Sequence, residues 1–308
     1  MDQVSFKDWI STYCDHDKCA AAFSDRKQFF RVNTIKMDLA KFSGITKLKY
    51  AATPYYDMAF ELTEPHGYEI GRTWEYFLGY IYPQSLPSIL VSLIVDPKPE
   101  DEVLDVAAAP GSKFSHMAML MGNKGTLVGN DIKREKTSAL FATINRMNVL
   151  NSIVTERDGS RLDWFSRFDK VLLDAPCTAL GSGESAPERW ELEHSQKISV
   201  LQKKMLFSSY DALRPGGTLV YSTCTYAKEE NEEVVANLLQ NVPTAKLEDI
   251  TLDFPHEKGL SDYGEEFRKC RRVYPFHLQS EGFFMAKIKK SEDTPETKSV
   301  LPKDGGAA

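Results

Sequence analysis

Short apolar runs alternate with longer amphipathic segments between about residue 100 and residue 240. An apolar run closed by turn residues is typical of a strand inside a parallel sheet, and apolar residues every three or four positions are typical of a helix. Their alternation predicts a mostly parallel sheet with helices on both faces. We expect strands at 102–108, 125–131, 152–158, 170–175 and 217–224, and helices at 112–122, 133–147, 195–213 and 228–240.

The flanking segments have a different character. Before the alternating region, strand-like runs at 28–36 and 58–64 and helical patterns at 73–82 and 85–95 predict a small α/β domain over 1–95. After it, the run EGFFMAKIKK (281–290) predicts an antiparallel strand near the edge of the main sheet. The main domain would therefore cover 96–290, and the polar tail 291–308, with its Pro and Gly, is expected to be disordered.

Composition adds bounds on the class of protein. Hydrophobic residues make up 42% and charged residues 27% of the 308 positions, which is ordinary for a soluble globular chain. No apolar run is long enough to span a membrane, and the polar start MDQVSFKDWI is neither a secretory signal nor a transit peptide. Five cysteines are an odd number and too sparse for a disulfide framework. We therefore expect free thiols, a cytoplasmic location and a monomer.

The net charge of −6 provides no global attraction to nucleic acid, so an RNA site would have to be a local basic patch. The basic run FRKCRRVYP, with Arg271 and Arg272, is the best candidate for phosphate contacts, although such runs are often only solvated faces. Arg31 forms a second candidate surface together with Lys41, Lys47 and Lys49. The acidic run EENEEVV (229–235) is predicted to be a solvated helix face. The run CDHDKC (14–19) lacks a second Cys/His pair nearby, so no zinc site is expected.

Acidic residues stand at or near the ends of several predicted strands, namely Asp105, Asp131, Asp158 and Asp174. In open α/β sheets, ligands bind outside the carboxyl ends of the strands. There Asp131 could accept from both hydroxyls of a ribose, and Asp158 from an adenine amino group. The alternative is that these acids only cap helices or turns.

The turn in VLDVAAAPGSKFSH lies between a predicted strand and a predicted helix, and brings backbone N–H groups close to a ligand. It is not G-x-G-x-x-G, so a dinucleotide is disfavoured. Recognition of ribose and adenine without a phosphate cradle suggests S-adenosylmethionine. Lys113 opens the helix, where a cation is electrostatically disfavoured, so we expect it to contact a carboxylate or the substrate.

Two thiols occupy corresponding positions in this pattern. Cys177 follows one predicted strand in the run DAPC, and Cys224 ends another in the run STC. The thiolate is the reactive form, and a free thiol of pKa ~8.5 is only slightly ionised at neutral pH. Cysteines more often pack as small apolar residues. Placement of both at the ligand edge favours a chemical role.

The motifs resemble those of the Sun-domain (Nop2/Sun) RNA cytosine-5 methyltransferases, over about residues 29–290. The runs that carry the resemblance are DVAAAPGSK, DAPC, YSTCTYAKEENEEVV, FRVNT, YPQS and YPFHLQSEGFFMAKI. The chain is most similar to the short archaeal tRNA enzymes of that family. The resemblance implies a Rossmann-like class I methyltransferase with a mostly parallel seven-stranded sheet, plus the small N-terminal α/β domain.

The resemblance also implies an activity and residue roles. The activity is methyl transfer from S-adenosylmethionine to C5 of a cytosine in RNA, with tRNA favoured, on a base that is flipped or unpaired. Cys224 would add to C6, Cys177 would assist release, and Asp174 would hold the cytosine edge. No metal is implied. The expected cofactor contacts are Ala107, Ala108, Ala109, Pro110, Gly111, Ser112, Lys113, Asp131, Lys136, Asp158 and Asp174.

Several positions depart from the family pattern. The family usually has CAAPGGK and PCSG, whereas this chain has Ala107, Ser112 and Ala179 at the variant positions. Ser112 could cap the helix that it opens. Lys136 stands where an arginine is common, which weakens a planar contact.

Two alternative functions stay open, and a third is disfavoured. The first is an rRNA cytosine-5 methyltransferase, and the second is a non-catalytic RNA-binding assembly factor on the same fold. A DNA cytosine methylase is disfavoured by the STC cysteine and by the lack of a separate DNA-recognition domain.

Overall fold

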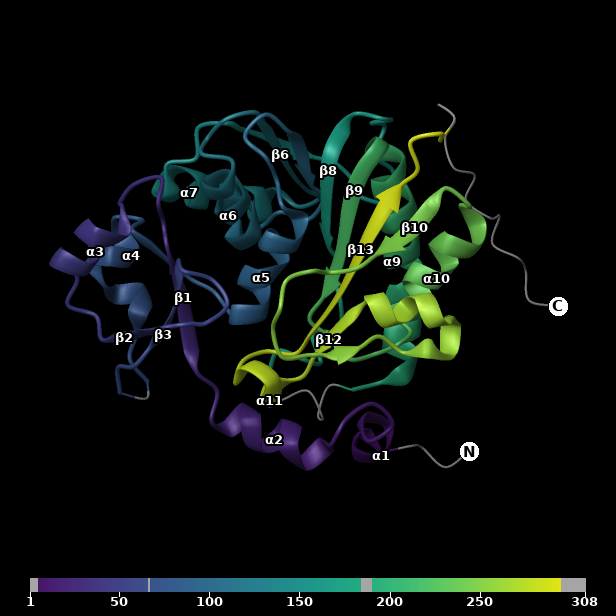
Figure 1. The fold of residues 1–308 in the computed structure, drawn as a ribbon, viewed down its shortest axis with the longest axis horizontal. Helices are drawn as coiled ribbons and strands as arrows, with labels where there is room; N and C mark the ends of the chain where they lie inside the picture. The colour runs from purple at the N-terminus through teal and green to yellow at the C-terminus, as the bar shows by residue number, and fades with distance from the viewer. Residues whose placement is uncertain (1–4, 66, 184–189, 295–308) are drawn as a thin grey trace.

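A twisted sheet of nine strands runs through the larger part of the molecule, as counted over residues 5–65, 67–183 and 190–294, which the computed structural model describes (Figure 1). Five neighbouring strands, in the order β7-β6-β5-β8-β9, are parallel, as the alternating pattern predicts. Their bounds are β5 Glu102–Asp105, β6 Thr126–Asp131, β7 Ser152–Glu156, β8 Phe168–Asp174 and β9 Leu213–Thr223. The predicted mostly parallel sheet is confirmed in this half.

The other half of the sheet is antiparallel and differs from the prediction. The C-terminal strand β13 (Phe283–Lys290) pairs with β9 on one side and with both β10 (Ala245–Glu248) and β12 (Arg271–Val273) on the other. It is therefore an interior strand, and its expected place near the edge is wrong. The apolar run in β13 is buried on both faces, which is typical of an interior strand. The short β11 (Glu257–Lys258) pairs with β12.

The strand count also differs from seven. Strands β10 and β12 pair with different ends of β13 and so share one position in the sheet. With β11 added at the edge, the assigned strands number nine. The predicted disordered tail lies outside the described residues from 295 onward.

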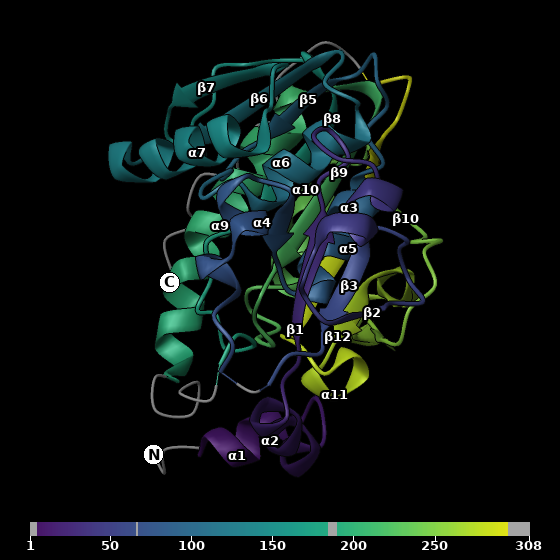
Figure 2. The same ribbon diagram turned by 90° about the vertical axis from the view of Figure 1, so that its left-hand side faces the viewer.

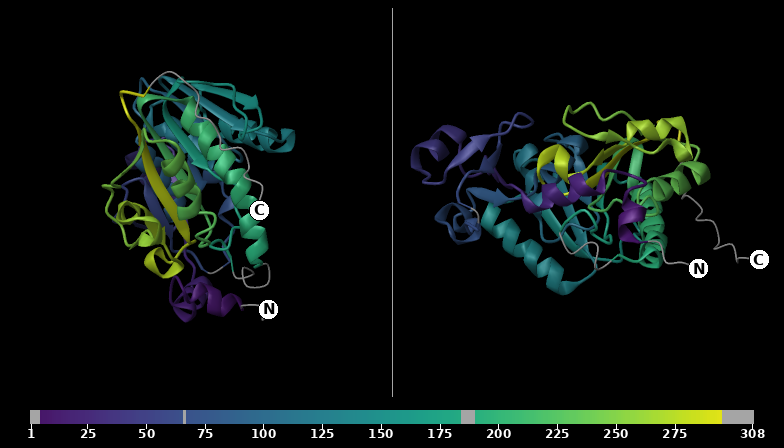
Figure 3. Two further views of the ribbon diagram at one scale, coloured as in Figure 1. Left: turned by 90° about the vertical axis from the view of Figure 1, so that its right-hand side faces the viewer. Right: turned by 90° about the horizontal axis from the view of Figure 1, so that it is seen from below.

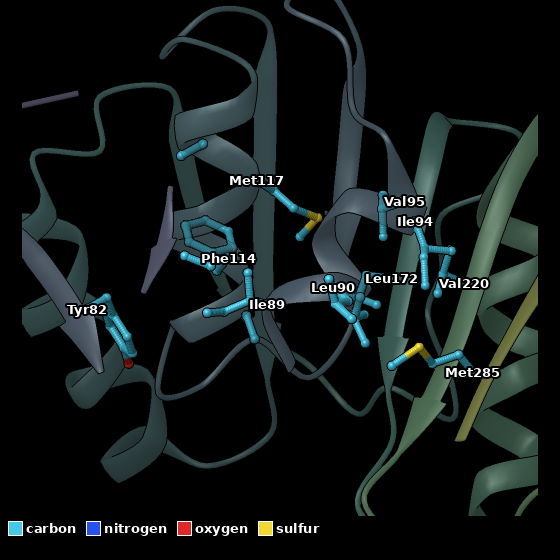
Figure 4. Close-up of a cluster of buried hydrophobic side chains, with 14 of the residues drawn as sticks. Tyr82, Ile89, Leu90, Ile94, Val95, Phe114, Met117, Leu172, Val220 and Met285 are labelled. Carbon is cyan, nitrogen blue, oxygen red and sulfur yellow. The ribbon is translucent and has the colours of Figure 1, made fainter. Parts of the chain in front are cut away.

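Helices cover both faces of the sheet, because successive strand residues point to opposite sides. Leu172 in β8 and Val220 in β9 belong to one hydrophobic core, whereas their neighbours belong to the other. Figure 4 shows the first core, where Ile89 lies beside Phe114 and Leu90 lies beside Leu172. The first face carries α5 (Leu86–Val95), α6 (Ser112–Leu120) and α7 (Arg134–Met147), and the second carries α9 (Leu192–Ala212) and α10 (Glu232–Asn241) (Figure 3).

The N-terminal part contains a four-stranded antiparallel sheet in the order β2-β3-β1-β4 (Figure 2). Its strands are β1 Gln28–Val32, β2 Tyr50–Ala52, β3 Ala59–Leu62 and β4 Ile81–Pro83, accompanied by α3 Leu39–Ile45 and α4 Trp74–Phe77. The helix expected over 73–82 ends early, because Gly79 turns the chain with φ +70° against the Arg146 carbonyl. Helix α5 follows this sheet in sequence but packs on the large sheet.

Two N-terminal helices lie at the bottom of Figure 1, where α2 (His16–Ser24) contacts α11 (Pro275–Leu278). Trp9 in α1 (Phe6–Ile10) packs in a cluster with Leu180, Tyr226 and Tyr274. This cluster covers the loops that follow both candidate thiols. Single 3₁₀ turns occur at Ile70–Arg72, Ser261–Tyr263 and Glu265–Lys269. No described helix combines the length and apolar character needed to cross a membrane.

Candidate active site

A cleft of about 450 Å³ opens at the carboxyl ends of the five parallel strands β5, β6, β7, β8 and β9. Eight of the predicted site residues line it, namely Ala107, Ala109, Asp131, Lys136, Asp158, Asp174, Cys177 and Cys224. The other predicted cofactor residues, Ala108, Pro110, Gly111, Ser112 and Lys113, belong to the adjoining turn and helix start. The parallel topology therefore brings side chains from five strand ends to one cavity.

The turn before α6 depends on close packing at Gly111. This residue has φ +105° and is the N-cap of α6, and a Cβ here would lie about 3 Å from Thr143 and Leu140 in α7. Only glycine suits both the conformation and the approach. The expectation that Ser112 caps the helix is wrong, because Ser112 is already the first helical residue.

Lys113 forms an ion pair with Asp174 inside the molecule. Its Nζ lies 2.8 Å from Oδ2 of Asp174, and the Ser222 hydroxyl donates to Oδ1 at 2.7 Å. Burial by itself would lower the pKa of Lys113, but the attraction of Asp174 outweighs it and the pKa is raised. The cation therefore persists in this buried place, as the helix-start argument predicts for a lysine with a carboxylate partner.

The two candidate thiols are direct neighbours. The Sγ atoms of Cys177 and Cys224 lie 3.3 Å apart, and both side chains are partly exposed at the cleft. The pKa of Cys177 is raised well above its usual range, first by the hydrogen bond with Cys224, then by burial and by the negative charge of Glu230. Cys177 therefore holds its proton and is suited to donate it in a hydrogen bond to the neighbouring sulfur.

The two acids predicted to bind a nucleoside differ in their surroundings. Asp131 is nearly buried; its Oδ1 accepts from its neighbour Ile132 N at 2.8 Å, and its Oδ2 has no hydrogen-bond partner within the described chain. Lys136 Nζ is 3.8 Å from that carboxylate, beyond hydrogen-bond reach. Asp158 Oδ1 accepts from the backbone and the hydroxyl of Ser160, which lowers its pKa. One oxygen of Asp158 therefore caps a turn, which was the alternative to ligand binding. The buried Oδ2 of Asp131 is available to accept a hydrogen bond from a ligand.

Two residues of the site region were not among the predicted site residues. Asp105 is 2% exposed, and burial, with repulsion from Asp174, raises its pKa to about 8. Asn130 lines the cleft and its amide donates to Val106 O and Arg157 O, which ties three strand ends together. A polar residue directly before Asp131, inside an apolar strand, was the signal that could have identified Asn130.

The predicted RNA contacts at Arg31 and Arg272 are wrong, because both side chains are used inside the protein. Arg31 is fully buried and donates to Ser115 Oγ at 2.5 Å and to Gln84 Oε1 at 3.1 Å. Arg272 is 2% exposed and forms an ion pair with Glu232. Neither guanidinium can reach an RNA phosphate.

Arg271 is only partly buried, and its guanidinium donates to the carbonyl groups of Ile250 and Lys269. Its contact with RNA stays a prediction. The lysines of the other candidate surface, Lys41, Lys47 and Lys49, are exposed.

The acidic run 229–235 is not the solvated helix face that was predicted. Glu230, Asn231 and Glu232 are fully buried, and Glu229 is nearly so. Asn231 accepts from Thr223 and donates to the Thr225 carbonyl, so the run folds back onto the end of β9. Charge density in the sequence does not reveal these inward contacts.

Comparisons with known proteins agree with this geometry. Residues 92–289 match the family model described as 16S rRNA methyltransferase RsmB/F. The chain is 38% identical over 274 residues to the tRNA (cytosine(49)-C(5))-methyltransferase of Pyrococcus abyssi, covering 84% of this chain and 87% of that protein. It is 35% identical over 306 residues to ribosomal RNA small subunit methyltransferase F of Vibrio cholerae, covering 93% of this chain and 63% of that longer protein.

A solved structure has the same fold over nearly the whole chain. It is NSun6 from Pyrococcus horikoshii with SFG, which superposes with a TM-score of 0.81 at 26% identity. The match covers 90% of this chain and 94% of that chain.

Proposed function

Because this chain belongs to the 16S rRNA methyltransferase RsmB/F family, we propose that it transfers a methyl group from S-adenosylmethionine to C5 of a cytosine in RNA. The observation that carries the proposal is the pair of thiols, 3.3 Å apart, at the edge of the cleft beside the Lys113–Asp174 ion pair. C5 of cytosine is a poor nucleophile, and a thiolate that adds to C6 makes C5 reactive. A site for this reaction needs a nucleophilic sulfur and groups that hold the ring.

The cleft fits the cofactor of this family. SFG, which is present in the P. horikoshii neighbour, is an analogue of S-adenosylmethionine. In this chain the buried Oδ2 of Asp131 has no hydrogen-bond partner among the described residues and can accept from a ribose hydroxyl. The turn 107–111 would border the nucleoside, with Lys136 and Asp158 at the cleft wall. When bound, the cofactor supplies an electrophilic methyl group.

The protein's own groups then have distinct roles. The Cys224 thiolate adds to C6 of the cytosine, and Asp174 holds the base by accepting a hydrogen bond from the exocyclic amino group and by sharing a proton with N3. Lys113 keeps the Asp174 side chain in place through its 2.8 Å ion pair. After methylation, the C5 proton passes to water, the electrons of the C5–H bond restore the C5–C6 double bond, and Cys224 is expelled from C6 as a thiolate. The S–H group of Cys177 donates a hydrogen bond to that departing sulfur and assists release.

We favour tRNA as the substrate. The chain is 38% identical to the archaeal relative named for tRNA and 35% identical to the bacterial relative named for ribosomal RNA. The rRNA alternative keeps the same chemistry. The exposed Lys41, Lys47 and Lys49 offer a basic surface on the N-terminal part for the phosphates. The cytoplasmic location and the monomeric state stay predictions.

The test is direct. Purified protein is incubated with S-adenosylmethionine and either tRNA transcripts or a 16S rRNA fragment, and new 5-methylcytosine is mapped by bisulfite sequencing. The same mapping on cells with and without the gene identifies the natural target. Methylation confined to rRNA would replace tRNA by the rRNA alternative, and RNA binding without methylation would favour the assembly factor.

A further inference from the structure

A buried carboxylate lies directly behind the two thiols. Glu230 is fully buried, and its oxygens accept from the Thr178 backbone N–H at 2.9 Å, the Thr178 hydroxyl at 2.5 Å and the Gln202 amide at 3.1 Å. The same Gln202 amide also donates to the Pro176 carbonyl at 2.9 Å. Hydrogen bonds therefore hold the backbone on both sides of Cys177, at Pro176 and at Thr178.

The contacts of Glu230 extend to the segment that bears the other thiol. Thr225 Oγ1 lies 3.5 Å from Glu230 Oε1 and 3.0 Å from Thr178 Oγ1. Thr178 directly follows Cys177, and Thr225 directly follows Cys224. The Glu230 carboxylate thus connects Thr178, which follows Cys177, with Thr225, which follows Cys224.

Packing alone does not explain a carboxylate at this position. Burying an ionised group is costly unless hydrogen bonds or a cation compensate, and an apolar side chain would fill the space without that cost. Within the described chain no cation forms an ion pair with Glu230, and its donors are neutral groups from the loop after Cys177 and from α9. The hydrogen bonds therefore specify the conformation of that loop.

We propose that Glu230 is a positioning residue, which sets the separation and orientation of Cys177 relative to Cys224 and thereby controls release of the product from Cys224. The first half of this proposal concerns geometry alone, whereas the second half rests on the proposed methyltransferase function. The negative charge of Glu230 also opposes ionisation of Cys177, which keeps that sulfur a hydrogen-bond donor.

The geometric half is tested by a thiol–disulfide equilibrium. In a glutathione buffer, one glutathione disulfide and the two protein thiols give one Cys177–Cys224 disulfide and two glutathione thiols, so electrons and protons balance. Peptide mapping by mass spectrometry measures the linked fraction. The background carries Cys14→Ser and Cys19→Ser, because those two sulfurs also lie close together, 3.0 Å apart.

The variants are Glu230→Gln, Glu230→Ala and Thr178→Val. The matched control is Glu233→Gln, which alters a nearby carboxylate that pairs with Lys203 instead. We expect the equilibrium constant for the disulfide to fall by about tenfold in the Glu230 variants, less in Thr178→Val, and not in the control. Thermal unfolding identifies any variant that does not fold, and Thr178→Val then provides the test, since it removes only one hydroxyl.

The functional half is tested in a single turnover with RNA. Glu230→Gln should form the covalent protein–RNA species and methylate the base, but release it about tenfold more slowly than the control. An unchanged glutathione equilibrium in folded variants would overturn the positioning role. A shifted equilibrium with normal release would overturn the control of release. If the equilibrium shifts but the wild-type protein methylates no RNA, the geometric role stands and the proposed function fails.

Discussion

The Sγ atom of Cys177 lies 3.3 Å from the Sγ atom of Cys224, although 47 positions separate them in the chain. The two residues follow β8 and β9, which are adjacent parallel strands, so their carboxyl ends are neighbours. This proximity allows one sulfur to act as nucleophile and the other to assist its departure.

The first prediction separates the roles of the thiols. Cys224→Ala should be inactive and should form no adduct, because it lacks the sulfur that adds to C6. Cys177→Ala should still attack and methylate, then accumulate a covalent protein–RNA species. The species is seen as a shifted band on a denaturing gel, and it should vanish in the double variant. A band in Cys224→Ala alone would reverse the assignment.

The second prediction concerns the cofactor. Asp131 has a buried oxygen without a hydrogen-bond partner among the described residues, at the edge of the cleft. Asp131→Ala should weaken binding of S-adenosylmethionine by about 1.5–3 kcal/mol, as expected for loss of a charged hydrogen-bonding group. Isothermal titration calorimetry measures the affinity for S-adenosylmethionine, and Asp249→Ala, at an exposed position, is the control. Equal affinity in both variants would exclude Asp131 from the binding site.

The third prediction is a pH dependence of stability due to Asp105. Burial, then repulsion from Asp174, raises its pKa in the folded protein to about 8, compared with about 4 in the unfolded chain. Between about pH 4 and about pH 8, Asp105 keeps its proton in the folded protein and loses it in the unfolded chain. The contribution of protonated Asp105 to stability is therefore complete below about pH 4 and is lost as the pH rises through about 8. Relative to Asp105→Asn, the wild-type free energy of unfolding should fall by up to about 1.4 kcal/mol per pH unit.

Urea unfolding of the cofactor-free proteins from pH 5 to pH 8 tests this dependence. Asparagine keeps the shape of the side chain and cannot ionise, so the two curves should diverge as the pH increases. Parallel curves would mean that Asp105 has an ordinary pKa in the folded protein.

The fourth prediction concerns Ala179, in the loop after Cys177. Its φ of +55° is in the left-handed region, which a Cβ disfavours. Ala179→Gly should therefore raise the free energy of unfolding by about 0.5–1 kcal/mol, after allowance for the greater freedom of glycine in the unfolded chain. Chemical denaturation measures the change. The control Ala20→Gly, at an exposed position in helix α2, should lower it by about 1 kcal/mol.

The fifth prediction follows from the correction at Arg272. Its ion pair with Glu232 is almost completely buried, so Arg272→Ala leaves a carboxylate without its cation in the interior. The free energy of unfolding should fall by about 3–5 kcal/mol. Arg268→Ala removes an exposed pair with Glu265 and should change stability by less than about 0.5 kcal/mol. A similar small effect in both variants would place Arg272 at the surface.

Local patterns in the sequence were sufficient for much of the architecture. The alternation of apolar runs and amphipathic segments located the five parallel strands and the helices between them, because each pattern reflects which side of one element is buried. The acids and thiols after those runs were correctly expected to meet at one edge, since parallel strands place their carboxyl ends together. The motifs identified the family, which the comparisons confirm.

The roles of individual charged residues depended on the tertiary structure. Arg31 bonds with Ser115, 84 positions away, Arg272 with Glu232, 40 positions away, and Glu230 with Thr178, 52 positions away. A local pattern shows a charge and predicts solvent exposure, because an unpaired ion in the interior is unstable. Only the packing of distant elements supplies the partners that make burial of these charges possible. The same holds for β13, which became an interior strand because β10 and β12 pair along its second side.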